Sequence, residues 1–195
     1  MSYLKRAVFG TAIVFIISLF AAFFGYLFRL VLARNLTVEE YGLFYSVLAL
    51  ISLLWLFKDL GTGQALAKFI PEFKINKRYD LIKKSLISAF TLQTISAVVL
   101  ALLLFIFSNY LGNNYFHHPE AAIIVKILAI YLILKPLQMI CTCAFQGFQN
   151  MKYFALVDLT RSIIALILVS FGFIFTRSII VPSIVYAISP LFLGL

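Results

Sequence analysis

The amino-acid sequence predicts an all-α, polytopic membrane protein with about six transmembrane helices. Hydrophobic residues make up 64% of the chain and the mean hydropathy is +1.07, whereas soluble domains have roughly 45–50% apolar residues. Long apolar runs alternate with short polar segments, and most basic residues lie in those segments. The net charge of +9 therefore reflects membrane orientation under the positive-inside rule, and we exclude a nucleic-acid partner.

The first helix is expected at residues 7–33, after Lys5 and Arg6. About 20 residues cross the hydrocarbon core of a membrane. The uncharged run 7–28 is too long for a signal-peptide core, and no Ala-x-Ala cleavage site follows it. Arg29 would lie near the far interface, where it could extend to the headgroups, which we prefer, or line a lumen between helices.

The second helix is expected at residues 41–64, and a capping box formed by Thr37 and Glu40 would start it. The same loop fits a glycosylation sequon at Asn35. We prefer the capping role, because so short a loop leaves a transferase little access.

A basic loop is expected at residues 65–84, followed by a third helix within 85–107. Such a cluster of cations indicates a cytoplasmic loop and is compatible with contact to anionic lipid headgroups. In the third helix, Gln93 and Thr94 are expected to form interhelical hydrogen bonds. The loop carries six cations against two acids: Lys68, Lys74, Lys77, Arg78, Lys83 and Lys84 against Glu72 and Asp80.

A fourth helix is expected at residues 120–145, after a polar outer loop at 109–119 whose two adjacent histidines are expected to be solvated rather than metal-binding. Lys126 and Lys135 are nine positions apart, so they should face different sides of a straight helix. Lys126 is shallow enough to extend to the headgroups, and Lys135 lies deeper. Pro136 directly follows Lys135 and should kink the helix there.

A fifth helix is expected at residues 153–175 and a sixth at 179–195. Asp158 and Arg161 are three positions apart and share a face of the fifth helix. The sequence stops inside the apolar sixth run, so we expect this to be the N-terminal lobe of a longer protein, with a second lobe absent from this chain.

The distribution of cations predicts a cytoplasmic N-terminus. The segments proposed as cytoplasmic hold nine cations and the outer loops hold two: Lys5, Arg6, Lys68, Lys74, Lys77, Arg78, Lys83, Lys84 and Lys152, against Arg34 and Arg177.

Charged residues from three helices are expected to converge in the cytoplasmic half of the membrane. The helix rise puts Lys58 roughly 25 Å and Lys135 roughly 22 Å from the outer surface, and Arg161 about 12 Å from the inner one. Such charges either pair, pinning helices together, or line a hydrated vestibule that attracts an anionic headgroup, and both alternatives stay open. The candidate site is Lys58, Asp59, Lys135, Asp158 and Arg161, with Arg29 and Lys126 as weaker outer-side candidates; no catalytic or metal-binding residue is expected.

Three stretches of the chain, in order, resemble a known transporter family. Asp59-Leu60-Gly61 with the KFIPE run at 68–72 resembles the end of the second membrane helix of prokaryotic polysaccharide (O-antigen type) flippases. Residues 33–43 (ARNLTVEEYGL) resemble the first outer loop of that family, and 145–152 (FQGFQNMK) its fourth-to-fifth helix turn. These flippases belong to the multidrug/oligosaccharidyl-lipid/polysaccharide exporter superfamily, whose members have roughly twice as many membrane helices as this chain.

The resemblance implies a membrane transporter that flips lipid-linked oligosaccharide or polysaccharide precursors across the prokaryotic plasma membrane for cell-surface polysaccharide biosynthesis. It implies two lobes that rock to alternate access, no enzymatic activity, no cofactor, and an undetermined coupling ion, H+ or Na+. Expected partners are the lipid-linked glycan, membrane lipids and glycan-assembly membrane proteins. Two alternatives are a multidrug/cation exporter of the same superfamily and a non-transporting membrane scaffold subunit. An exporter would favour buried acids without neighbouring cations, and a scaffold would bury its charges in complete pairs.

Overall fold

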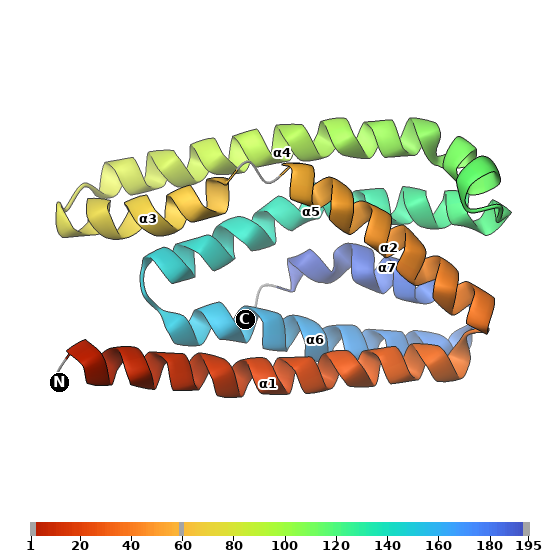
Figure 1. Cartoon of the computed structure of the whole chain (residues 1–195), viewed down its shortest axis with the longest axis horizontal. Helices are drawn as coiled ribbons and strands as arrows, with labels where there is room; N and C mark the ends of the chain where they lie inside the picture. The colour runs from red at the N-terminus through yellow and green to blue at the C-terminus, as the bar shows by residue number, and fades with distance from the viewer. Residues whose placement is uncertain (1–2, 59–60, 193–195) are drawn as a thin grey trace.

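The computed structural model describes residues 3–58 and 61–192, and these residues are helical throughout apart from short turns (Figure 1). The prediction of an all-α, polytopic membrane protein is confirmed. Five helices are long and apolar enough to span a membrane, namely α1, α2, α4 with its π-helical extension, α5 and α6, and a shorter apolar segment follows them. The elements are α1 (Tyr3–Asn35), α2 (Val38–Lys58), α3 (Thr62–Ile75), α4 (Tyr79–Tyr110), π-helical η1 (Leu111–Tyr115), α5 (Pro119–Gly147), α6 (Met151–Phe175), α7 (Ile180–Ile188) and 3-10 helical η2 (Ser189–Leu191).

The helices form two layers with α7 between them (Figure 1). α1 and α6 pack side by side in one layer, while α5 contacts α2, α3 and α4 in the other. α7 packs against both α5 and α6. The main apolar core lies where α5 meets α2 and α7, and it includes fully buried Phe44, Val47, Ile124, Leu128 and Leu132.

The turns alternate between the two ends of the bundle (Figure 1). The N-terminus, the α3–α4 turn and the α5–α6 turn lie at one end, which we call the basic end. The opposite end carries the α1–α2, α4–α5 and α6–α7 turns. The turns and adjoining helix ends that carry lysine and arginine follow the same division in the described residues: Lys74, Lys77, Arg78, Lys83, Lys84 and Lys152 belong to elements at the basic end, and Arg34 and Arg177 to elements at the other.

The segment expected as a basic loop at 65–84 is mostly helical, so that expectation is wrong. α3 extends to Ile75 and α4 begins at Tyr79. Lysine and glutamate are good helix formers, and Leu66 and Ile70 give α3 an apolar face that is buried against α4 and α5. This buried face explains why the segment folds as a helix despite its charge.

The expected continuous helix at 41–64 is interrupted, which is a second correction. α2 ends at Lys58 and α3 begins at Thr62. Gly61 has φ 74°, a left-handed conformation that an α-helix excludes and that glycine adopts without strain. The two helices together make one passage from the far end to the basic end of the bundle (Figure 1).

Several local predictions are confirmed and others need correction. Thr37 and Glu40 form the expected capping box: the Thr37 backbone N–H donates to Glu40 Oε2 at 2.8 Å, and the Glu40 N–H donates to Thr37 Oγ1 at 3.2 Å. Gln93 forms the expected interhelical bond by donating to Thr62 Oγ1. The hydroxyl of Thr94 is buried without a hydrogen-bond partner among the residues that the structure describes, contrary to expectation.

The segment before α5 differs from its prediction, and α5 itself agrees with it. Residues 109–119, expected as a loop, are largely taken up by the end of α4 and by η1. α5 contains Pro136 and bends partway along its length, as predicted (Figure 1). Proline removes one backbone hydrogen bond and clashes with the preceding turn, which accounts for the bend.

Candidate functional site

Two lysines predicted on different helices lie against the same indole ring. Lys58 Nζ, at the end of α2, is 4.1 Å from the centroid of the Trp55 ring, and Lys135 Nζ of α5 is 4.5 Å from it. Lys135 Nζ is also 5.0 Å from the centroid of the Tyr131 ring. Cations within about 6 Å of an aromatic face are attracted to it. The structure therefore brings Lys58 and Lys135 together through Trp55, and Lys58 is only 6% exposed.

Tyr186 of α7 connects Lys135 with Arg161. The rings of Tyr131 and Tyr186 have centroids 5.0 Å apart. Lys135 lies against the Tyr131 ring, and Arg161 lines the same cavity as Tyr186. Three of the predicted cations are thus linked through aromatic side chains of α2, α5 and α7.

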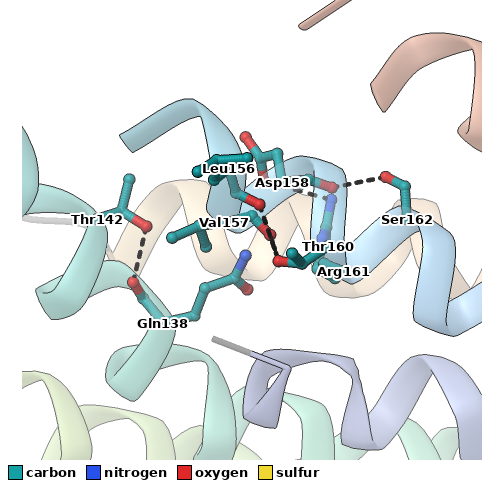
Figure 2. A network of polar contacts seen from close by, with 8 residues as sticks. All are labelled: Gln138, Thr142, Leu156, Val157, Asp158, Thr160, Arg161 and Ser162. Atoms are coloured by element: carbon teal, nitrogen blue, oxygen red, sulfur yellow. Dashed lines mark hydrogen bonds and ion pairs between the residues drawn. The ribbon is translucent and has the colours of Figure 1, made fainter. Parts of the chain in front are cut away.

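Arg161 and Asp158 share a face of α6, as their spacing predicted. Arg161 Nη2 lies 3.8 Å from Asp158 Oδ1, and the Ser162 hydroxyl donates to the Asp158 carbonyl oxygen at 2.8 Å (Figure 2). The Asp158 side chain is 59% exposed and that of Arg161 is 28% exposed. An exposed ion pair at this separation contributes about 0–1 kcal/mol to stability.

A cavity of about 210 Å³ opens between α1, α2, α6 and the α7–η2 segment. Arg29 from α1 and Arg161 from α6 both line it, and Arg29 lies with its guanidinium carbon 6.0 Å from the centroid of the Tyr45 ring. Arg29 thus lines a cavity between helices and is exposed there, while its extension to the headgroups stays a prediction. The lining residues are Gly25, Phe28, Arg29, Phe44, Tyr45, Leu48, Arg161, Ser162, Ala165, Tyr186 and Ser189.

Lys126 lies apart from this cavity. Its Nζ is 3.4 Å from Asn109 Oδ1 and 5.5 Å from the centroid of the Phe105 ring, both on α4. Lys135, on the same helix, faces α2 instead, so the two lysines point in different directions, as their nine-residue spacing predicted. Asp59, the remaining candidate, lies outside the described residues.

Aromatic and hydroxyl side chains of the site were not predicted. Tyr131 precedes Lys135 by four residues and Trp55 precedes Lys58 by three, spacings that place each pair on one helix face. That signal was available in the sequence. The positions of Tyr186 and Ser189 depend on how α7 packs against α5 and α6, and no local pattern gives that contact.

Residues 7–195 match the family described as polysaccharide biosynthesis protein. The chain belongs to this family. The predicted resemblance is therefore confirmed, and the five long apolar helices make the chain a multi-pass membrane member of the polysaccharide biosynthesis protein family.

A curated relative of this family member is an uncharacterized membrane protein of Methanocaldococcus jannaschii. It is 30% identical over 198 residues, which cover 95% of this chain and 39% of the relative. The chain thus spans well under half the length of the relative. No solved structure matches the chain.

Proposed function

We propose that the protein takes part in flipping lipid-linked oligosaccharide or polysaccharide precursors across the plasma membrane, for cell-surface polysaccharide biosynthesis. Membership of the polysaccharide biosynthesis protein family supports the broad role. The observation that supports transport of a phosphate-bearing lipid is the cavity with two arginines, Arg29 and Arg161, among aromatic side chains. An ion pair joins Arg161 to the neighbouring acid Asp158, so the charges of these three described residues sum to a net positive value.

A positive potential among aromatic rings suits the phosphate groups of a lipid-linked glycan. Arginine presents forked donors that match phosphate oxygens, and lysine acts as a compact point charge. Ion pairs strengthen where water is partly excluded, because the effective dielectric constant is lower there than in bulk water. Arg161 lines the cavity itself, whereas Lys135 lies behind its Tyr186 wall, against Tyr131 and Trp55, so Arg161 is proposed to meet the phosphate directly and Lys135 to add to the positive potential around it.

The same proposal includes three further points. This lobe and a second one alternate access, the N-terminus is cytoplasmic, and the protein transports its substrate rather than transforming it chemically. The concentration of cations at the basic end of the bundle supports the orientation. The coupling ion is left open between H+ and Na+.

The first prediction separates phosphate binding from structural pairing. Arg161→Gln should lower glycan export about tenfold or more, because it removes a charge-assisted contact worth roughly 1.5–3 kcal/mol. Lys135→Gln should lower export less, because Lys135 lies behind the cavity wall. Detergent melting temperatures should change little. Arg161→Lys should recover part of the export, because it keeps the charge and loses the fork. The measurement is export of surface glycan by cells producing each variant, alongside melting curves.

Two controls accompany this test. Lys126→Gln removes the same charge from the same helix at a place away from Trp55, Tyr131 and the cavity, and it should leave export unchanged. Asp158→Asn is combined with Arg161→Gln, because structural pairing predicts that removing the stranded acid restores folding and export. Such a rescue would leave structural pairing as the explanation and remove the phosphate-binding role.

A further inference from the structure

The end of α3 and the start of α4 carry a group of cations that the candidate site does not use. We call residues 72–84 the basic hairpin, and it lies at the basic end of the bundle (Figure 1). Its charged side chains are all exposed, and no ion pair of 4.0 Å or less joins its cations to an acid in the part of the chain that the structure describes. Five positive and two negative charges leave the hairpin with a net charge of +3. The cations are Lys74, Lys77, Arg78, Lys83 and Lys84, and the acids are Glu72 and Asp80.

Lys83 and Lys84 lie on the side of α4 that faces away from the bundle. Lys83 precedes Ile87 by four positions, and Lys84 precedes Ile95 by eleven, spacings that place each pair on one face of a helix. Ile87 is 54% exposed and Ile95 is 59% exposed, in a helix that is long and apolar enough to span a membrane. No other described helix covers this apolar face, so it meets lipid tails, and the two lysines continue it beyond the tails.

The same two lysines lie at the depth of the lipid headgroups. The uncharged run 86–107 of α4 is roughly 33 Å long at 1.5 Å per residue, which matches the ~30 Å hydrocarbon core. Lys83 and Lys84 come just before this run, so their backbone lies roughly 3–5 Å outside the core. The headgroup layer is roughly 5–8 Å thick on each side of the core. A lipid headgroup is therefore within reach of both ammonium groups, whereas a soluble acidic protein would have to displace lipid from this face.

The turn of the hairpin holds its cations in a fixed arrangement. The Arg78 N–H donates to the Phe73 carbonyl oxygen at 2.9 Å, and the Lys77 N–H donates to the Lys74 carbonyl oxygen at 3.1 Å. These two bonds form a Schellman motif, whose left-handed position is usually glycine. Lys77 occupies that position with φ 56°, and a residue with a Cβ is strained there. A cation thus stands where glycine would be more stable, which is explained if its charge has a partner outside the protein.

We propose that the basic hairpin is a docking surface for anionic phospholipid headgroups in the leaflet at the basic end of the bundle. Lys83 and Lys84 contact the headgroup phosphates, and the cations of the turn add to the attraction. Clusters of roughly four to eight cations beside a membrane span attract anionic lipids, and each cation strengthens binding about fivefold. No residue of the hairpin lines the cavity, so this inference does not rest on the proposed transport function.

The test measures how often each kind of lipid lies beside the hairpin in vesicles. In a purified variant without Cys141 and Cys143, a bimane fluorophore is attached to Ser88→Cys, an exposed position one turn after Lys84. Phosphatidylcholine vesicles contain a small share of either phosphatidylglycerol or phosphatidylcholine with a nitroxide near the top of one acyl chain, which quenches bimane on contact. We expect phosphatidylglycerol to reach half-maximal quenching at about a fivefold lower mole fraction than phosphatidylcholine, or lower still.

Matched variants assign this preference to the lysines. Lys83→Gln/Lys84→Gln should remove most of the preference, and Lys83→Arg/Lys84→Arg should keep it because the charges remain. Arg34→Gln/Arg177→Gln removes two exposed cations from the other end of the bundle and should leave the preference at Ser88→Cys unchanged.

Two further measurements separate the surface from general effects of charge and stability. Bimane at Ile174→Cys, 76% exposed near the other end of α6, should show less than about a twofold preference for phosphatidylglycerol. Lys77→Gly should lower the preference at Ser88→Cys about twofold and raise the melting temperature, because it removes a charge and relieves the strained backbone.

Each outcome decides for or against the docking surface. Equal quenching by the two lipids at Ser88→Cys would overturn it and leave the hairpin cations to a soluble acidic partner. A preference that survives in Lys83→Gln/Lys84→Gln, or one that is as large at Ile174→Cys, would show that anionic lipid gathers around the whole protein without docking at the hairpin. A fall in both melting temperature and preference in Lys77→Gly would remove Lys77 from the surface.

Discussion

Two lysines from different helices lie against the ring of Trp55 in the interior of this protein. An aromatic face stabilises a cation by about 0.5–1 kcal/mol at an exposed site and by about 2 kcal/mol or more when water is excluded. The ring carries no net charge, so this stabilisation leaves the positive charge of the lysines in place. Aromatic contacts of this kind therefore stabilise Lys58 and Lys135 among the packed helices without cancelling their charge, as the proposed attraction of an anion requires.

Single residues of the site could be predicted where their helix spacing was enough. Asp158 and Arg161 were placed correctly on one face, because three positions make most of a helical turn. For Arg29 two alternatives stayed open, since the sequence gives the depth of a residue along its helix but not the direction of its side chain. Ser189 could not be predicted, because its environment consists of residues from other helices.

A second prediction concerns Gly172 in the contact between α6 and α7. A Cβ added at this position would overlap the Val181 side chain, so Gly172→Ala should destabilise the protein by roughly 1–3 kcal/mol through overpacking. Combining it with Val181→Ala should restore part of that loss. The control is Gly42→Ala, where an added Cβ meets nothing within 4 Å. Thermal unfolding in detergent compares the unchanged protein with Gly172→Ala, the Gly172→Ala/Val181→Ala double variant and Gly42→Ala. Equal stability of Gly172→Ala and Gly42→Ala would contradict the close contact.

The break between α2 and α3 is the main feature at the scale of helices. The apolar run before it and the mixed run after it both have helical patterns, so hydrophobic periodicity does not mark the point at which α2 ends. Gly61 adopts a left-handed conformation at this break, and α3 then turns so that Leu66 and Ile70 are buried against α4 and α5. Gly63 packs closely against α5, because an added Cβ would lie 3.0 Å from Met139 Cε and 3.3 Å from Cys143 Sγ.

A third prediction tests this break through the backbone alone. Gly61→Ala should destabilise the protein by about 1–2 kcal/mol, because a residue with a Cβ is strained at φ 74°. A new Cβ there would meet nothing within 4 Å, so packing does not contribute. Gly61→Asn should lose less, since asparagine tolerates the left-handed region better than alanine does. If alanine and asparagine are both tolerated like glycine in melting experiments, Gly61 does not hold this conformation.

At the scale of the whole molecule, the alternation of the helices could be predicted and their lateral arrangement could not. Apolar length and loop cations are local properties, and they indicated the number of spans closely. α1 packs against α6, far away in the sequence, and α5 contacts helices of both layers. Apolar residues surround most of these helices, so hydrophobic periodicity does not identify which face meets which partner.

A fourth prediction concerns orientation in the membrane. Asn113 in η1 and Asn76 in the α3–α4 turn are both exposed and lie at opposite ends of the bundle. In a variant without Cys141 and Cys143, a membrane-impermeant thiol reagent added outside intact cells should label Asn113→Cys and not Asn76→Cys, because the cation-rich end is expected in the cytoplasm. Labelling after membrane disruption controls for access. Labelling of Asn76→Cys alone in intact cells would invert the orientation.

Trp55 is the single tryptophan of the chain. Its position beside Lys58 and Lys135 means that the tryptophan fluorescence of residues 1–195 originates within the cluster of charges. Indole emission responds to nearby ammonium groups and to the polarity around the ring. Trp55 therefore serves as an intrinsic fluorescent probe of this cluster. An anion or water that reaches the lysines would change the wavelength or the intensity of its emission, and no dye needs to be attached.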